Sequence, residues 1–124
     1  MEFQFKKDNP DAKQRRKICE EILANNEGKL PVILEKGIKE EADLPEIDKT
    51  KFLVPNALTV TQFKAMILKR MPIIEKNPEE AFVLLVNAKN LILGEQTMGE
   101  IYEKYKDPDD LFLYIAYAKK KIWG

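Results

Sequence analysis

Hydrophobic residues follow two different spacings along the chain, and each spacing predicts one kind of element. Val60, Phe63, Ile67 and Met71 recur every three or four residues after Thr59, which is the pattern of a helix with one apolar face. Other apolar residues form short continuous runs of branched and aromatic side chains, which are typical of strands. In chain order we expect helices over residues 3–9, 11–25, 59–71 and 97–105, and strands over residues 30–34, 52–55, 81–86 and 111–117.

The order of these elements predicts an α+β fold. Strands and helices alternate too irregularly for a doubly wound sheet, and two strands before the first internal helix suit a hairpin. The last six elements suggest a β-grasp, in which a four-stranded mixed sheet wraps around a central helix, with two extra helices at the N-terminus. Pro55 closes the second strand and cannot donate to a ladder, so we expect this strand at a sheet edge, where another strand can add.

Charge and composition exclude several classes of function. The 124 residues contain 21 Lys and Arg against 21 Asp and Glu, a balance that disfavours a nucleic-acid binder. No His and a single Cys19 leave no ligands for a zinc cage, no His-dependent triad and no internal disulfide. The longest apolar runs fall far short of the roughly 18 residues that span a bilayer. We expect a cytoplasmic protein whose association with membranes is peripheral or covalent.

The acidic and nucleophilic residues do not predict a catalytic site. Doublets such as Glu79–Glu80 and Asp109–Asp110 place neighbouring carboxylates on diverging side chains, so we expect them in solvent. Cys19 lies on the apolar face of its helix, where a thiol is usually an inert small hydrophobe. The scattered glycines form no phosphate-binding loop. We therefore expect neither an enzyme nor a bound metal or cofactor.

Four sequence blocks, found in the same order, carry a resemblance to a known family. They are Lys29–Lys36, Lys51–Pro55, Leu58–Phe63 and Phe112–Tyr117, and the likeness extends to Thr97–Gly99 and to the ending Trp123–Gly124. These blocks resemble the ubiquitin-like autophagy modifiers, the family that includes the GABA-receptor-associated protein. The resemblance implies a ubiquitin-like β-grasp: a helical arm over residues 1–27, a core over residues 28–118 and a flexible conjugation tail over residues 119–124, all in one domain.

The resemblance implies that Gly124 is a substrate position. In this family the terminal Gly carboxylate is adenylated with ATP, passed between cysteines of activating and conjugating enzymes, and joined to phosphatidylethanolamine. A cysteine protease processes the tail and reverses the conjugation. Glycine suits a narrow enzyme channel because it has no side chain, and Lys119, Lys120 and Lys121 favour an exposed tail. The natural precursor either ends at Gly124 or continues beyond it.

The resemblance also implies docking of short peptides with an aromatic-x-x-aliphatic core, which cargo receptors and adaptors carry. The strand edge at Lys51–Leu53 would pair with the peptide backbone. A basic rim of Arg15, Arg16 and Lys49 would attract acidic residues that precede the motif. An aromatic pocket is expected at Ile22, Pro31, Ile33, Lys51, Leu53 and Phe112, and an aliphatic pocket at Phe52, Val54, Pro55, Leu58, Phe63, Met66, Ile67 and Arg70.

The chain departs from the family pattern at several positions. Ile18 stands where the family often has an acidic residue at the aromatic pocket, and Trp123 replaces the usual Phe or Tyr. Residues 37–46 and 72–80 appear as loop insertions. We expect a lipid-conjugated modifier that acts in the cytoplasm and on autophagosome or related vesicle membranes. The alternative is an unconjugated peptide-binding adaptor in vesicle traffic or cytoskeletal attachment, which needs the pockets but not Gly124.

Overall fold

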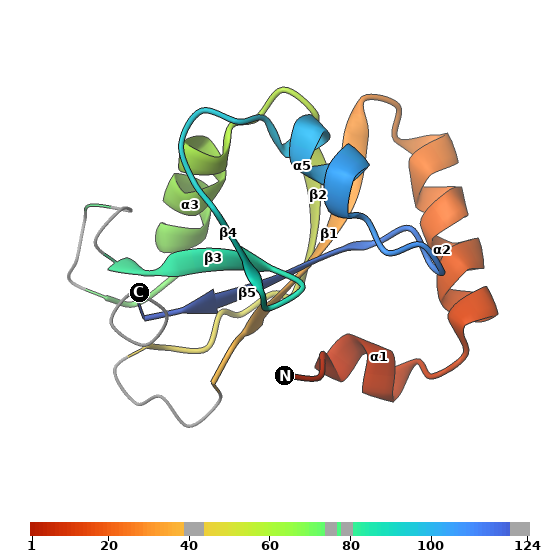
Figure 1. Cartoon of the computed structure of the whole chain (residues 1–124), viewed down its shortest axis with the longest axis horizontal. Helices are drawn as coiled ribbons and strands as arrows, with labels where there is room; N and C mark the ends of the chain where they lie inside the picture. The colour runs from red at the N-terminus through yellow and green to blue at the C-terminus, as the bar shows by residue number, and fades with distance from the viewer. Residues whose placement is uncertain (39–43, 74–76, 78–80, 120–124) are drawn as a thin grey trace.

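A five-stranded mixed sheet forms the centre of the computed structural model, which describes residues 1–38, 44–73, 77 and 81–119 (Figure 1). Strands β1 and β5 run parallel, and the other neighbours are antiparallel. The strand order is β2-β1-β5-β3-β4, so β2 lies at a sheet edge, as Pro55 predicted. The strands are β1 (Lys29–Lys36), β2 (Lys51–Pro55), β3 (Val83–Val86), β4 (Asn90–Ile92) and β5 (Leu113–Ala118).

Each longer helix begins at a side chain that caps its free N–H groups. Asp11 accepts hydrogen bonds from the backbone of Lys13 and Gln14 and so starts the second helix. Thr59 and Thr97 form capping boxes, each with the residue three positions on. The helices are α1 (Gln4–Asp8), α2 (Ala12–Asn25), α3 (Val60–Leu68) and α5 (Met98–Tyr105).

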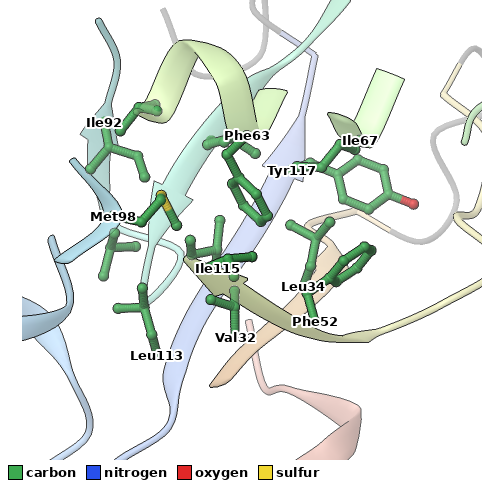
Figure 2. Packing of buried hydrophobic residues seen from close by; sticks show 14 of the residues in the cluster. Val32, Leu34, Phe52, Phe63, Ile67, Ile92, Met98, Leu113, Ile115 and Tyr117 are labelled. Carbon is green, nitrogen blue, oxygen red and sulfur yellow. The ribbon is translucent and has the colours of Figure 1, made fainter. Parts of the chain in front are cut away.

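The sheet separates two apolar clusters, because successive side chains of a strand point to opposite faces. On one face, which we call the α3 face, Val32 and Leu34 pack beneath Phe63 and Ile67 (Figure 2). On the other face, the arm face, helices α1 and α2 lie beside the sheet (Figure 1). Ile33 is buried there among side chains from both helices. The arm-face cluster consists of Phe3, Phe5, Cys19, Ile33, Phe112, Tyr114 and Ala116.

The α+β β-grasp is confirmed, with one strand more than predicted. The additional strand is β4, which follows β3 through a turn in which Asn87 and Ala88 have φ of 56° and 59°. Such turns usually contain Asn-Gly or Asp-Gly, and the Asn-Ala pair here gives no hairpin signal. Helix α3 also ends at Leu68, before the predicted Met71.

Candidate functional site

Strand β2 forms one edge of the described sheet, and β4 forms the other. Side chains alternate along this strand: Lys51, Leu53 and Pro55 are exposed, whereas Phe52 and Val54 are buried. Leu53 is 38% exposed, so a large apolar side chain of this strand is accessible to a partner. The edge therefore offers backbone groups and an apolar side chain to an added strand.

The residues predicted for the aromatic pocket come together on the arm face. The antiparallel register places Pro31 opposite Leu53 and Ile33 opposite Lys51, so these four side chains share one face of the hairpin. Phe112 belongs to the same cluster as Ile33, and half-buried Ile22 of α2 packs against that cluster. Lys51 and Leu53 form the exposed border of this set.

Most residues predicted for the aliphatic pocket lie on the opposite face, between β2 and α3, whereas strand alternation places Pro55 on the same side of β2 as Lys51 and Leu53. The rings of Phe52 and Phe63 are 6.1 Å apart and nearly perpendicular. Val54, Phe63 and Ile67 are fully buried, so they also belong to the core. The more accessible members of the set are Pro55, Leu58, Met66 and Arg70.

Arg15 is a correction to the predicted basic rim. Its guanidinium is buried, donates to Asp110 at 2.7 Å and to the carbonyl of Asn9 at 2.6 Å, and so presents no charge to a ligand. Arg16 is exposed and pairs with Glu20 across one helical turn. Lys49 is exposed, and its ammonium lies 5.2 Å from the centre of the Phe52 ring. Among the described basic side chains, Lys51 belongs to β2 itself, and those of Lys49 and Arg70 lie near the Phe52 ring of that strand.

Asp110 is a second correction, because it is fully buried rather than solvated. Its carboxylate accepts from Arg15, from the Tyr114 hydroxyl and from the backbone N–H of Phe112. Burial and the hydrogen bond to Asp110 raise the pKa of Tyr114, so the phenol stays protonated and donates. This network joins α2 to the segment that precedes β5 and fixes the start of the strand after Phe112.

Helix α1 contributes contacts that the sequence pattern did not predict. The ring of Phe5 meets the ring of Phe112 edge-on, with centres 5.1 Å apart, and the Lys51 ammonium lies 5.3 Å from the centre of the Phe5 ring. The carboxylate of Glu35 accepts from the backbone N–H groups of Gln4 at 2.7 Å and Phe5 at 2.9 Å. The sequence held one signal of these contacts: Glu35 is a charged residue that directly follows the apolar residues of β1.

Cys19 is buried, as its position on the apolar helix face predicted. Burial raises the pKa of its thiol to about 12, so the group stays protonated and unreactive near neutral pH. Gly124, with the rest of residues 120–124, lies outside the described residues. Within the described part of the chain, every helix is too short or too polar to cross a membrane.

Comparison with known proteins identifies the family. Residues 14–124 match the family model for the autophagy protein Atg8, ubiquitin like. The chain is 47% identical over 103 residues to human microtubule-associated protein 1 light chain 3 gamma, covering 83% of this chain and 67% of that protein. It is 38% identical over 124 residues to autophagy-related protein 8 of Vanderwaltozyma polyspora, covering 100% and 98%. It is 34% identical over 111 residues to protein lgg-2 of Caenorhabditis elegans, covering 90% and 82%. The chain therefore belongs to the Atg8 ubiquitin-like family of autophagy proteins, as the four sequence blocks predicted.

Proposed function

We propose that this chain is a ubiquitin-like modifier that is conjugated through Gly124 to phosphatidylethanolamine on autophagic membranes. There it recruits cargo receptors and adaptors that carry aromatic-x-x-aliphatic motifs. The observation that carries the recruiting role is the free edge of β2, which has one predicted apolar set on each side of it.

The spacing of the peptide motif matches this geometry. In an extended peptide, residues three positions apart point to opposite faces, because side chains alternate along a strand. A peptide added to the edge of β2 would therefore direct its aromatic residue toward the arm face, beside Leu53 and Lys51. Its aliphatic residue would point toward α3, beside Phe52 and Leu58. Backbone pairing supplies affinity in this mode, and the two pockets supply selectivity.

The charges beside β2 favour peptides with acidic residues before the aromatic position. Lys49 and Arg70 both lie over the Phe52 ring, with Arg70 held in part by Asp48 at 3.1 Å. Exposed charges of this kind contribute about 0–1 kcal/mol each and act mainly on the rate of encounter.

Conjugation requires enzymes outside this chain. The Gly124 carboxylate is adenylated by ATP with release of pyrophosphate, and a cysteine of the activating enzyme displaces AMP to form a thioester. The thioester passes to a conjugating enzyme, and the amine of phosphatidylethanolamine then displaces the thiolate to form an amide. Cys19 is buried, with its thiol pKa raised to about 12, so it is unsuited to the relay. A cysteine protease is the expected partner for processing and release.

A reconstituted conjugation assay tests this proposal. The chain is incubated with activating and conjugating enzymes, ATP and liposomes that contain phosphatidylethanolamine. We expect a product of shifted mobility for the wild type and none for Gly124→Ala, whereas Gly28→Ala, a substitution away from the tail, retains conjugation if it folds. An unmodified wild type, or an unchanged product from Gly124→Ala, would favour the unconjugated adaptor. Conjugation would move the chain from the cytoplasm to the autophagosome membrane.

A further inference from the structure

Helix α1 lies before residue 14, where the match to the family model begins, although the alignment with autophagy-related protein 8 covers the whole chain. Its Phe5 packs directly against residues of the predicted aromatic pocket. Phe5 is 7% exposed and contacts two residues of the predicted pocket, one buried and one exposed. Its edge meets the buried ring of Phe112, and its face carries the ammonium of the exposed Lys51. One side chain of the N-terminal helix thus bridges the base and the border of the pocket.

We propose that Phe5 forms a wall of the aromatic pocket and thereby determines which aromatic side chain the pocket accepts. This inference rests on the proposed peptide-binding function and adds a specificity-determining residue to it. The occupant is the aromatic residue of the bound peptide.

The position of this wall is set by polar contacts. A helix of five residues is too short to be stable alone, so α1 depends on its contacts with the rest of the fold. Glu35 holds the backbone of Gln4 and Phe5 at the start of the helix. Lys6 pairs with Asp107 at 2.7 Å. Glu35 is therefore a positioning residue for Phe5.

The space around Phe5 explains why the wall would affect selectivity. A cleft of about 470 Å³ runs between α1 and the start of β2, with Phe5, Glu35 and Ile47 among its lining residues, and of the residues predicted for the aromatic pocket it is lined by Lys51 alone. Phe5 therefore borders this cleft and also packs on Phe112 of the predicted pocket. Removing the Phe5 ring would enlarge the apolar space beside Phe112 and free the Lys51 ammonium from its aromatic partner. A larger space favours an indole over a phenyl ring, because unfilled apolar volume costs contact energy.

Titration of two matched peptides tests the wall. They differ only in carrying Trp or Phe at the aromatic position, and each is titrated by calorimetry into the wild type, Phe5→Ala and Phe3→Ala. Phe3 is the matched control, because it is also 7% exposed and belongs to the same arm, but its ring packs on Tyr114 at 5.2 Å. For Phe5→Ala we expect at least fivefold weaker binding of the Phe peptide and at least a threefold rise in the Trp-to-Phe affinity ratio. For Phe3→Ala we expect the wild-type ratio.

The outcomes separate the wall from the groove itself. If the wild type binds both peptides and folded Phe5→Ala keeps the wild-type affinity ratio, the proposal for Phe5 is wrong and the proposal of peptide binding at β2 is retained. If Phe3→Ala shifts the ratio as much, loosening of the arm explains the effect and the wall is again wrong. A wild type that binds neither peptide overturns both proposals.

Two further variants keep the test decisive. Phe5→Leu retains apolar volume but removes the ring, so it serves if Phe5→Ala does not fold, and we expect a smaller shift of the ratio in the same direction. Glu35→Gln weakens the hydrogen bonds that hold α1. A rise in the Trp-to-Phe affinity ratio in this variant would support the role of Glu35 in positioning Phe5. An unchanged ratio in Phe5→Leu contradicts the wall, and an unchanged ratio in Glu35→Gln contradicts the anchor.

Discussion

The two faces of the sheet are stabilised in different ways. The α3 face is packed with aliphatic and aromatic side chains, and Figure 2 shows Phe63 and Ile67 directed into it above the strands. The arm face has a smaller apolar cluster but adds buried polar contacts at both ends of the N-terminal segment. These are the Glu35 anchor of α1 and the Arg15–Asp110 pair of α2. Apolar packing is non-directional and tolerates adjustment, whereas a buried polar contact requires each partner in place.

This difference has a consequence for function. The aliphatic pocket proposed for the α3 face would have walls that are also core, since Phe63 and Ile67 are fully buried. The aromatic pocket proposed for the arm face would use Phe5, which lies on a short helix held by a few specific contacts. Local unfolding usually begins in terminal elements with few buried contacts. We therefore expect the aliphatic pocket to be rigid and the aromatic pocket to depend on the docking of α1.

The largest expected effect distinguishes the two faces by stability. Phe63→Ala removes a fully buried ring from the α3 face and should lower the free energy of unfolding by about 3–5 kcal/mol. Phe3→Ala removes a ring from the smaller cluster of the arm face and should cost less, because the Glu35 contacts that hold Gln4 and Phe5 remain. Urea denaturation of both variants measures the difference. Equal losses would show that the arm-face cluster stabilises the fold as strongly as the α3-face cluster does.

The second effect concerns the buried polar pair of the arm face. Asp110→Ala leaves the Arg15 guanidinium buried without its carboxylate, and we expect a loss of about 3 kcal/mol in the free energy of unfolding. The double variant Arg15→Met with Asp110→Ala removes the stranded charge and should lose less than the single variant. A double-mutant cycle, completed with Arg15→Met alone, measures this coupling. Additive losses would mean that the pair contributes no coupling to the arm.

The two faces also differ in how far the sequence predicted them. The α3 face was predictable, because its residues repeat at helical spacing or form apolar strands, and these local patterns report burial directly. The polar contacts of the arm face were not, since Glu35 and Gln4 are 31 positions apart and Arg15 and Asp110 are 95 apart. A charged residue in a sequence does not reveal its distant partner. For this reason the sequence pattern predicted Asp110 as a surface residue and Arg15 as part of the basic rim, and both predictions were wrong.

In the candidate site too, local sequence patterns predicted some features and missed others. The edge position of β2 followed from Pro55, because proline lacks an N–H and thus limits a strand to one neighbour. The grouping of the pocket residues came from the family resemblance and from the register of β1 with β2. Phe5 was missed because a short amphipathic segment does not indicate which face of a sheet it covers. Strand β4 was missed because its turn lacks glycine.

The third effect is on binding at the edge between the two faces. Leu53→Ala should weaken binding of an aromatic-x-x-aliphatic peptide tenfold or more, because Leu53 lies at the centre of the proposed groove. Its exposure of 38% means that stability should change little. Leu91→Ala is the matched control, an exposed leucine of β4 at the opposite edge, and should bind normally. Fluorescence titration of both folded variants checks this, and normal binding by Leu53→Ala would remove β2 from the proposed interface.

The smallest effect is a pH dependence that compares the thiol of Cys19 on the arm face with the phenol of Tyr117 on the α3 face. Burial raises the pKa of Cys19 on the arm face from 9.0 to about 12, and that of Tyr117 on the α3 face from 10.0 to about 12. Each group releases its proton more easily in the unfolded chain. Its stabilising contribution is therefore complete below the unfolded pKa and is lost as pH rises toward the folded pKa.

Between pH 8 and pH 10 the arm face should lose stability first. At about 1.4 kcal/mol per pH unit above the unfolded pKa, Cys19 should account for a loss of about 1.4 kcal/mol at pH 10, where Tyr117 has only begun to contribute. Urea denaturation at pH 8, 9 and 10 should show this decline in the wild type and a shallower one in Cys19→Ala. Tyr117→Phe should keep the wild-type decline over this range, although it loses the hydrogen bonds to Ile47 and Pro45. An unchanged decline of stability with pH in Cys19→Ala would mean that the thiol has the same pKa in the folded and unfolded chain. The thiol would then be in contact with water in the folded chain, so the arm would have to open at alkaline pH before the rest of the molecule unfolds.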